Sequence, residues 1–207
     1  CTSNDTRDRR LRASVVINID TKRILIDCGP DFRAQMLNEP FARLDAVLLT
    51  HEHYDHVGGL DDLRPFAKLS DLNIYSNAIT LKALKERMPY SFLEKRYPGV
   101  PALELHEVDA ETPFSIEGIE IQPVNIMHYK LPITGYRIEN FAYLTDVKSI
   151  PDSEFCKLKG LDTLVISALR IGDHIAHLSL QQALEVIERI APQRAYLTHM
   201  SHHIGLH

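Results

Sequence analysis

The residues best suited to chemistry form one tight cluster, His51-Glu52-His53-Tyr54-Asp55-His56, which directly follows the apolar run Val47-Leu48-Leu49-Thr50. Alternate side chains of an extended backbone face the same way, so the first two histidines can bind one metal ion. A turn after them can carry the adjacent carboxylate and the third histidine to a second ion. The ordinary alternative is a set of buried or solvated histidines, but packing does not explain three histidines and an aspartate within six residues. The cluster therefore predicts ligands for two metal ions.

Three further ligand-type residues follow short apolar runs. Residues 142–145 lead into Asp146, residues 195–198 lead into His199, and the weaker run 124–127 leads into His128. Runs of this length are typical of strands buried on both faces, and such sheets collect functional residues at their strand ends. We therefore expect the four strand ends to converge on one site.

These residues resemble the ligand pattern of the metallo-β-lactamase superfamily of hydrolases. The superfamily motif His-x-His-x-Asp-His matches residues 51–56, and the later single histidine, bridging aspartate and final histidine of the superfamily also have matches. His53 stands where the flavodiiron branch has glutamate, which disfavours an oxygen-reducing iron site. The resemblance implies one ion held by His51, His53 and His128, a second held by Asp55, His56 and His199, and Asp146 as the bridge between them.

A narrower resemblance, to the branch containing the cyclic phosphodiesterase of the bacterial carbon-phosphorus lyase pathway, rests on residues 58–65, 128–132 and 196–202. It implies that His177 is the general acid that protonates the leaving group, a task that the pKa of histidine suits near neutral pH. The alternative for His177 is a contact with the N-terminus of the next helix. The same branch binds a structural zinc, which implies that Cys1 and His202 are zinc ligands. Their alternative is an exposed thiol and a solvated imidazole.

The ligand set indicates hydrolysis by a metal-bridged hydroxide. Two divalent ions acidify a shared water and stabilise charge on the oxygens of a displacement at phosphorus or carbonyl carbon. Asp55, as a ligand of the ions that activate this water, is expected to be a catalytic residue as well. Imidazole and carboxylate suit zinc, manganese or iron(II), and we expect two zinc or manganese ions. Asp27 is expected to accept the ring N–H of a ligand histidine, with a turn residue before Gly29-Pro30 as the alternative.

The expected function is that of a phosphodiesterase acting on a small substrate, cyclic phosphodiesters included. The net charge of −5 argues against broad capture of nucleic acid, and the basic run at Arg7, Arg9, Arg10 and Arg12 is expected to be solvated rather than to contact substrate. A tRNA 3′-processing nuclease shares the ligands but normally adds a long basic arm that this sequence lacks. A thioester or β-lactam hydrolase would not need His177, and a metal-dependent binding module would not turn over an ester. The oligomeric state stays open, a homodimer included.

The elements that must position these residues alternate between strand and helix. Periodicity alone predicts an α/β protein, and the superfamily resemblance implies its αβ/βα four-layer sandwich, with two mixed β-sheets and helices outside. Ser179 is expected to cap a helix with an apolar stripe of Leu180, Ala183, Leu184, Ile187 and Ile190. The other predicted elements are a hairpin of residues 14–19 and 23–27, strands within 73–75, 116–126, 133–144 and 161–167, and helices from Asp31 and over 60–69 and 78–88.

Length and composition predict a single domain over residues 1–207. The chain has 44% hydrophobic residues and no linker, repeat or compositional break. Because it starts at a cysteine and stops in what reads as a turn, we expect N- and C-terminal segments to be missing. No apolar stretch could span a bilayer and no secretory leader is present, so a cytoplasmic location with no membrane partner is expected. Cys28 and Cys156 are expected to be buried and reduced.

Overall fold

The computed structural model describes residues 3–93 and 99–204, which divide into two compact units. Of the described residues, those within 11–109 and 115–119 form the first-sheet unit, and those within 1–10, 110–114 and 120–207 form the second-sheet unit. Each unit is built from segments that are not contiguous in sequence. The expected single domain over 1–207 stays a prediction, because a division into compact units does not test it.

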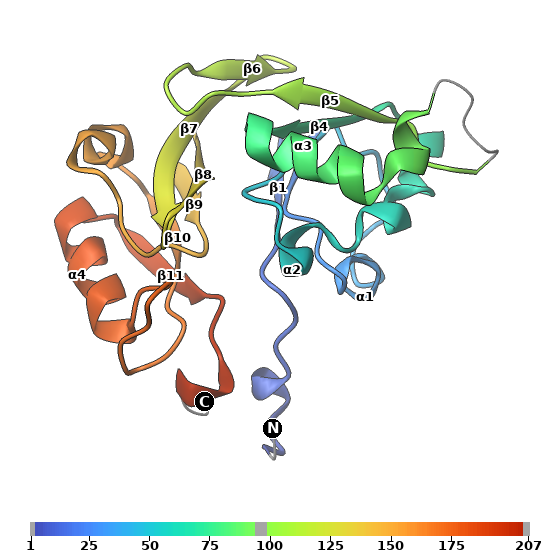
Figure 1. Ribbon diagram of the computed structural model, residues 1–207. Helices are drawn as coiled ribbons and strands as arrows, with labels where there is room; N and C mark the ends of the chain where they lie inside the picture. The colour runs from blue at the N-terminus through green and yellow to red at the C-terminus, as the bar shows by residue number, and fades with distance from the viewer. Residues whose placement is uncertain (1–2, 94–98, 205–207) are drawn as a thin grey trace. The chain divides into compact units, whose positions relative to one another are not determined.

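The first-sheet unit holds a five-stranded sheet of order β1-β2-β3-β4-β5, in which β1 and β2 are antiparallel and the other neighbours are parallel (Figure 1). Helix α3 lies against β5. The strands are β1 Val15–Ile19, β2 Lys22–Ile26, β3 Ala46–Leu48, β4 Leu72–Ser76 and β5 Leu103–Glu107. The α-helices are α1 Phe32–Met36, α2 Tyr54–Val57 and α3 Ala78–Arg87, and the 3-10 helices are η2 Leu60–Leu63, η3 Phe66–Lys68 and η4 Pro89–Phe92.

Local sequence explains most of these elements. The predicted hairpin forms with Val15 opposite Ile26. Residues 24–26 of β2 and all of β3, which pair in parallel, are buried and apolar, as is typical of central strands covered on both faces. Helix α3 begins after Asn77, whose side chain accepts a hydrogen bond from the Thr80 N–H. The predicted helix over 60–69 is wrong: it splits into η2 and η3 at Pro65, which has no N–H to donate and whose ring obstructs a continuous helix.

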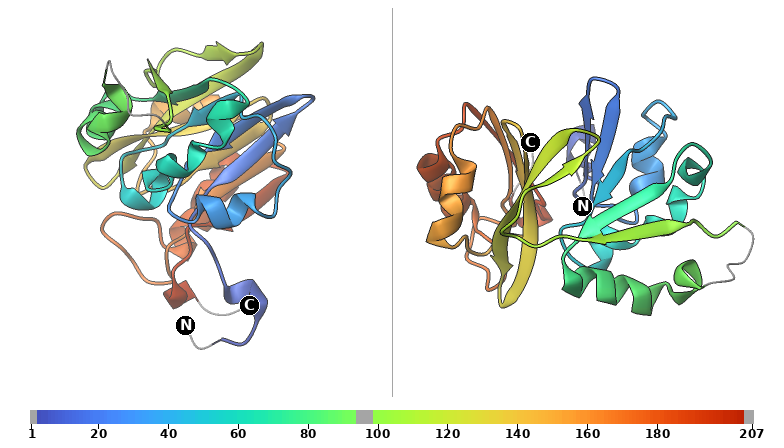
Figure 2. Two further views of the ribbon diagram at one scale, coloured as in Figure 1. Left: turned by 90° about the vertical axis from the view of Figure 1, so that its right-hand side faces the viewer. Right: turned by 90° about the horizontal axis from the view of Figure 1, so that it is seen from above.

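The second-sheet unit holds most of a six-stranded sheet of order β11-β10-β9-β8-β7-β6 (Figure 2). Antiparallel pairing from β7 to β9 and parallel pairing from β9 to β11 make this sheet mixed as well. Two mixed sheets with helices confirm the predicted α/β class. The strands are β6 Phe114–Ile116, β7 Ile119–His128, β8 Leu131–Ile138, β9 Phe141–Leu144, β10 Thr163–Ser167 and β11 Arg194–Thr198. The helices are η1 Thr6–Asp8, η5 Asp152–Leu158, α4 Leu180–Ile190 and η6 His202–Ile204.

Helix α4 packs against β10 and begins at a capping box, in which Ser179 and Gln182 each accept a backbone hydrogen bond from the other. Ala183 and Ile190 are buried, as predicted. Leu184 is 47% exposed, so its place in the predicted stripe is wrong. It lies about 100° round the helix from Ala183, at the edge of the buried face. Val186 packs against the core on the other side.

The two described cysteines differ in environment. Cys28 is fully buried in the apolar core of the first-sheet unit, as predicted. Cys156 is exposed, so the prediction that it is buried is wrong. It lies in η5, where the buried positions are Glu154 and Leu158 instead. Among the described residues, no helix is both long enough and apolar enough to cross a bilayer.

Candidate metal centre

The first set of predicted ligands lies just beyond the end of β3. Glu52 forms a bend, and His53, whose backbone is extended, is the N-cap of α2, so Asp55 and His56 fall in the single turn of that helix. This is the predicted change from extended chain to turn. The His51 Nε2 and His53 Nδ1 atoms are 3.0 Å apart, and the His56 Nε2 and Asp55 Oδ2 atoms are 3.4 Å apart. The first-sheet unit therefore brings all four residues of the cluster together.

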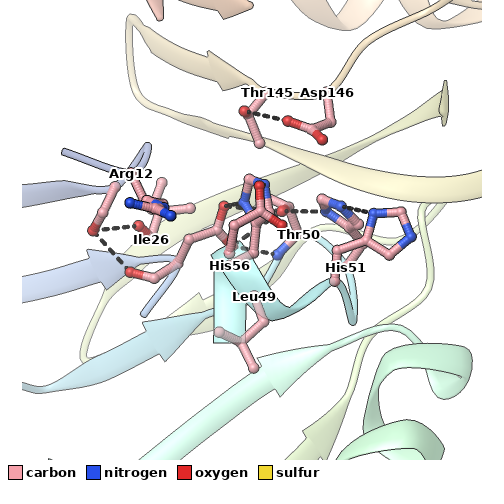
Figure 3. A network of polar contacts seen from close by, with 12 residues as sticks. Arg12, Ile26, Leu49, Thr50, His51, His56, Thr145 and Asp146 are labelled. Carbon is pink, nitrogen blue, oxygen red and sulfur yellow. Dashed lines mark hydrogen bonds and ion pairs between the residues drawn. The ribbon is translucent and has the colours of Figure 1, made fainter. Parts of the chain in front are cut away.

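A buried network behind these ligands orients two of the rings (Figure 3). Asp27, fully buried just after β2, accepts hydrogen bonds from the Thr50 N–H at 2.9 Å and the His56 Nδ1–H at 2.7 Å. The Thr50 hydroxyl lies 2.9 Å from Asp27 Oδ2 and 3.0 Å from His51 Nδ1. If that hydroxyl donates to the carboxylate, it accepts from His51, and both rings then carry their lone pair on Nε2.

The contact predicted for Asp27 is thus confirmed, whereas Thr50 was missed. The available signal was a hydroxyl residue directly before the first histidine of the motif. The backbone of Asp27 has φ +60°, in the left-handed region that non-glycine residues seldom occupy. This conformation is energetically unfavourable for an aspartate.

We expect Asp27→Asn to weaken zinc affinity by about 10- to 100-fold, because the amide offers one acceptor oxygen where the carboxylate offers two. Zinc affinity is measured by competition with a chromophoric chelator. Asp45→Asn is the matched control. Asp45 is also buried and accepts a hydrogen bond from the Arg23 N–H, but its ion-pair partners are Lys22 and Arg43 rather than a predicted ligand. Equal zinc affinity for the two variants would contradict the orienting role of Asp27.

The second set of predicted ligands lies at three strand ends of the second-sheet unit. His128 is the last residue of β7, Asp146 follows β9, and His199 directly follows β11. His199 Nε2 is 3.1 Å from Asp146 Oδ1, and His128 Nδ1 lies 3.0 Å from the Asp146 carbonyl oxygen, to which it can only donate. The Thr145 hydroxyl donates to the Asp146 carboxylate (Figure 3). Asp146 and His199 both have φ +53°.

His177, the predicted general acid, lies among these ligands. Its ring is 4.6 Å from that of His128 and stacks on that of His199 at 5.3 Å, between centroids. Its Nδ1 atom is 4.0 Å from Asp146 Oδ2. Burial lowers the pKa of His177 to about 4, the Asp146 carboxylate opposes this shift, and the neighbouring histidines add to it. The ring is therefore neutral at pH 7 and carries one N–H, and an anionic substrate beside it would favour the imidazolium.

The arrangement fits divalent metal ions. Two ligand atoms on one tetrahedral zinc ion, with bonds of about 2.0–2.1 Å, are separated by about 3.3 Å. The three ligand pairs described above lie at 3.0, 3.4 and 3.1 Å, each within a single unit. Neutral imidazole nitrogen and carboxylate oxygen are donors that zinc and manganese accept. The convergence of the two sets on one pair of ions stays a prediction.

The remaining predicted residues lie elsewhere or outside the described chain. His202 is exposed in η6, with its ring 3.9 Å from that of His203 between centroids. Cys1 lies outside the described residues, so the structural zinc stays a prediction. In the basic run, Arg7, Arg10 and Arg12 each form an ion pair with an aspartate, namely Asp5, Asp8 and Asp31.

Comparison with known proteins places the chain in a family. The model of the beta-lactamase superfamily domain matches residues 22–200. The chain belongs to the metallo-β-lactamase superfamily. The crystal structure of a new diphosphatase from the PhnP family is 38% identical to this superfamily member, with a TM-score of 0.90, and the match covers 98% of this chain and 78% of that one. The predicted superfamily and the predicted αβ/βα fold class are thereby confirmed, and so is the predicted resemblance to the branch of the carbon-phosphorus lyase phosphodiesterase, which is PhnP.

Two curated relatives are named for activities other than that of the diphosphatase. The octanoyltransferase of Porphyromonas gingivalis strain ATCC BAA-308 / W83 is 45% identical over 209 residues, which cover all of this chain but 42% of that protein. The superfamily member thus spans less than half of that relative. The exodeoxyribonuclease WalJ of Streptococcus pneumoniae strain D39 / NCTC 7466 is 25% identical over 219 residues, covering 91% of this chain and 77% of the relative. The superfamily fold and the diphosphatase relative together support a hydrolase.

Proposed function

We propose that this superfamily member is a dinuclear metal-dependent phosphodiesterase that acts on a small phosphodiester, cyclic ones included. The single observation that carries the proposal is the set of three ligand pairs at the spacing that a bound divalent ion requires. The PhnP-family diphosphatase supports phosphorus rather than carbonyl carbon as the reacting centre. Two zinc or manganese ions would supply an acidified water and would stabilise charge on the phosphoryl oxygens.

In this proposal each residue has a separate task. Asp27 and Thr50 hold the rings of His56 and His51. His177 donates a proton or hydrogen bond to the leaving oxygen. One ion would be held by His51, His53 and His128, the other by Asp55, His56 and His199, and Asp146 would be the ligand that both ions share.

A nuclease is the second candidate, favoured by the WalJ relative, which matches over nearly the whole chain. The net charge of −5 speaks against it, because polynucleotide binding relies on neutralising many phosphates. A small phosphodiester needs one or two such contacts. The predicted cytoplasmic location and the possible homodimer remain predictions.

We expect the purified protein to hydrolyse bis(p-nitrophenyl) phosphate, to lose this activity on treatment with a chelator, and to regain it with Mn²⁺ or Zn²⁺. Release of p-nitrophenolate is the measurement. A cyclic ribose phosphate, a single-stranded oligonucleotide, an octanoyl thioester and a β-lactam, tested at equal concentration, separate the substrate classes. Turnover of the thioester without turnover of any phosphodiester in either metal would overturn the proposal.

A further inference from the structure

Lys148 lies two residues after Asp146 and points its ammonium group at the chain that carries His177. The Nζ atom donates to the His174 carbonyl oxygen at 2.7 Å, and lies 3.4 Å from both the His177 carbonyl oxygen and the Gln182 amide oxygen. An ammonium group has three N–H donors and no acceptor, so these three oxygens can use all of them. Lys148 therefore serves the protein's own backbone and has no N–H left for a substrate phosphate.

The segment that Lys148 holds, residues 170–178, contains no regular helix or strand. Its ends are tied down by backbone bonds, from Leu169 N–H to the Leu178 carbonyl at 3.1 Å and from Leu178 N–H to the Val147 carbonyl at 2.7 Å. Its middle is solvated, since Ile171 and Ile175 are 63% and 66% exposed. A segment of this kind needs a tertiary contact to keep one conformation.

The ring of His177 does not supply that contact. Its buried Nδ1 atom has no hydrogen-bond partner within the described part of the chain, and the Asp146 carboxylate is 4.0 Å away. Ring packing against His128 and His199 is non-directional compared with a hydrogen bond. The position of the ring therefore depends on its backbone. There the Lys148 ammonium group, a charged donor, binds the carbonyl oxygens of both His174 and His177.

We infer that Lys148 is a positioning residue that fixes the backbone of His174 and His177, so that the His177 ring is held where a leaving oxygen departs. The inference rests on the proposed function, in which His177 is the proton donor. Gln182 extends the same contact to helix α4, because its side-chain oxygen also accepts from the Ser179 N–H at 3.1 Å. The helix cap, the segment before it and Lys148 are thus joined by one set of hydrogen bonds.

The test is the dependence of rate on the leaving group. Aryl phosphodiesters with p-nitrophenol and with phenol as leaving group are compared in wild type, Lys148→Met and Lys148→Arg, each loaded with metal. Lys148→Met should slow the phenyl ester about 10- to 100-fold more than the p-nitrophenyl ester, since a misplaced acid harms only the poor leaving group. The loss should fall on kcat rather than KM, and Lys148→Arg should restore part of it. Equal slowing of both esters would overturn the inference.

Lys157→Met is the matched control. Lys157 is a half-buried lysine of the same unit whose Nζ donates to the Ala110 carbonyl at 2.6 Å and to Glu154 at 2.8 Å. Its loss should lower stability but leave the ratio of the two ester rates as in wild type. A changed ratio in this control would assign the effect to general loosening and would also overturn the inference.

A second readout does not depend on turnover. In the zinc-loaded, isotopically labelled protein, the nuclear Overhauser contact between the His177 and His128 rings should weaken in Lys148→Met and persist in Lys157→Met. An unchanged contact in Lys148→Met overturns the inference even if the wild type hydrolyses no phosphodiester. Failure of wild-type turnover alone overturns the proposed function, so the two failures are distinguishable.

Discussion

Replacing Asp146 by alanine is expected to lower kcat for phosphodiester hydrolysis by about 10³-fold or more and to reduce the bound metal. Asp146 is buried, its carboxylate accepts a hydrogen bond from the Thr145 hydroxyl, and its Oδ1 atom lies 3.1 Å from His199 Nε2. In the proposed site it is the one ligand common to both ions. Loss of the bridge removes several kcal/mol of charge stabilisation in the transition state, and each 1.4 kcal/mol or so is tenfold in rate. Elemental analysis and kcat are measured on the same sample.

Asp152→Ala is the control for this change. Asp152 lies in the same unit, its side chain is 88% exposed, and its ion pair with Arg189 is on the surface. Removing it should alter neither metal content nor kcat, because exposed ion pairs contribute little. Full metal content and full turnover in Asp146→Ala would show that the bridging role is wrong.

The second large effect is expected from His177→Ala. Phosphodiesters with alkyl or phenyl leaving groups should be hydrolysed about 10²- to 10⁴-fold more slowly, because a basic leaving oxygen requires a proton from a positioned donor. The p-nitrophenyl ester should change far less, since its leaving group departs as a stable anion. Plots of log kcat against the pKa of the leaving group should therefore steepen.

His174→Ala separates the acid role from a general effect of losing an imidazole. The His174 ring is 5.0 Å from that of His177, between centroids, and its Nδ1 accepts the Ala176 N–H within its own segment. This variant should shift the rates of both kinds of ester alike. A parallel shift in His177→Ala as well would rule against the acid role.

The ligand positions could be predicted from sequence because the pattern that marks them is local. An apolar run followed by a histidine or aspartate is visible before His51, Asp146 and His199, and the structure places each of these residues shortly after its strand. Strands β3 and β9 are buried as predicted, but the prediction is wrong for β11, which lies at the edge of its sheet and leaves Tyr196 54% exposed. The switch from extended chain to helix at His53 was also foreseeable, since the motif needs one turn to separate its two ligand pairs. Alternation and apolar runs are properties of a few neighbouring residues.

The supporting residues were harder to predict because tertiary contacts decide their roles. In the sequence Thr50 resembles the other residues of its apolar run, and its role appears only when the fold places Asp27, which follows β2, beside it. In the sequence Lys148 resembles an ordinary surface lysine, and its role appears only from its hydrogen bond to the segment before α4. Cys156 and Leu184 were misplaced for a related reason: the apolar character of each was visible, but the rotation of its helix against the sheet was not.

The left-handed backbone at Asp27, Asp146 and His199 has a consequence for engineering. Each of these residues costs about 1 kcal/mol or more relative to glycine in the same conformation. Selection for thermal stability would therefore favour glycine or asparagine at these three positions. Each such substitution would remove a carboxylate or an imidazole from the candidate metal centre. Stability and metal binding make opposite demands on these three residues, so stabilising substitutions in this superfamily member have to be sought in its cores and loops.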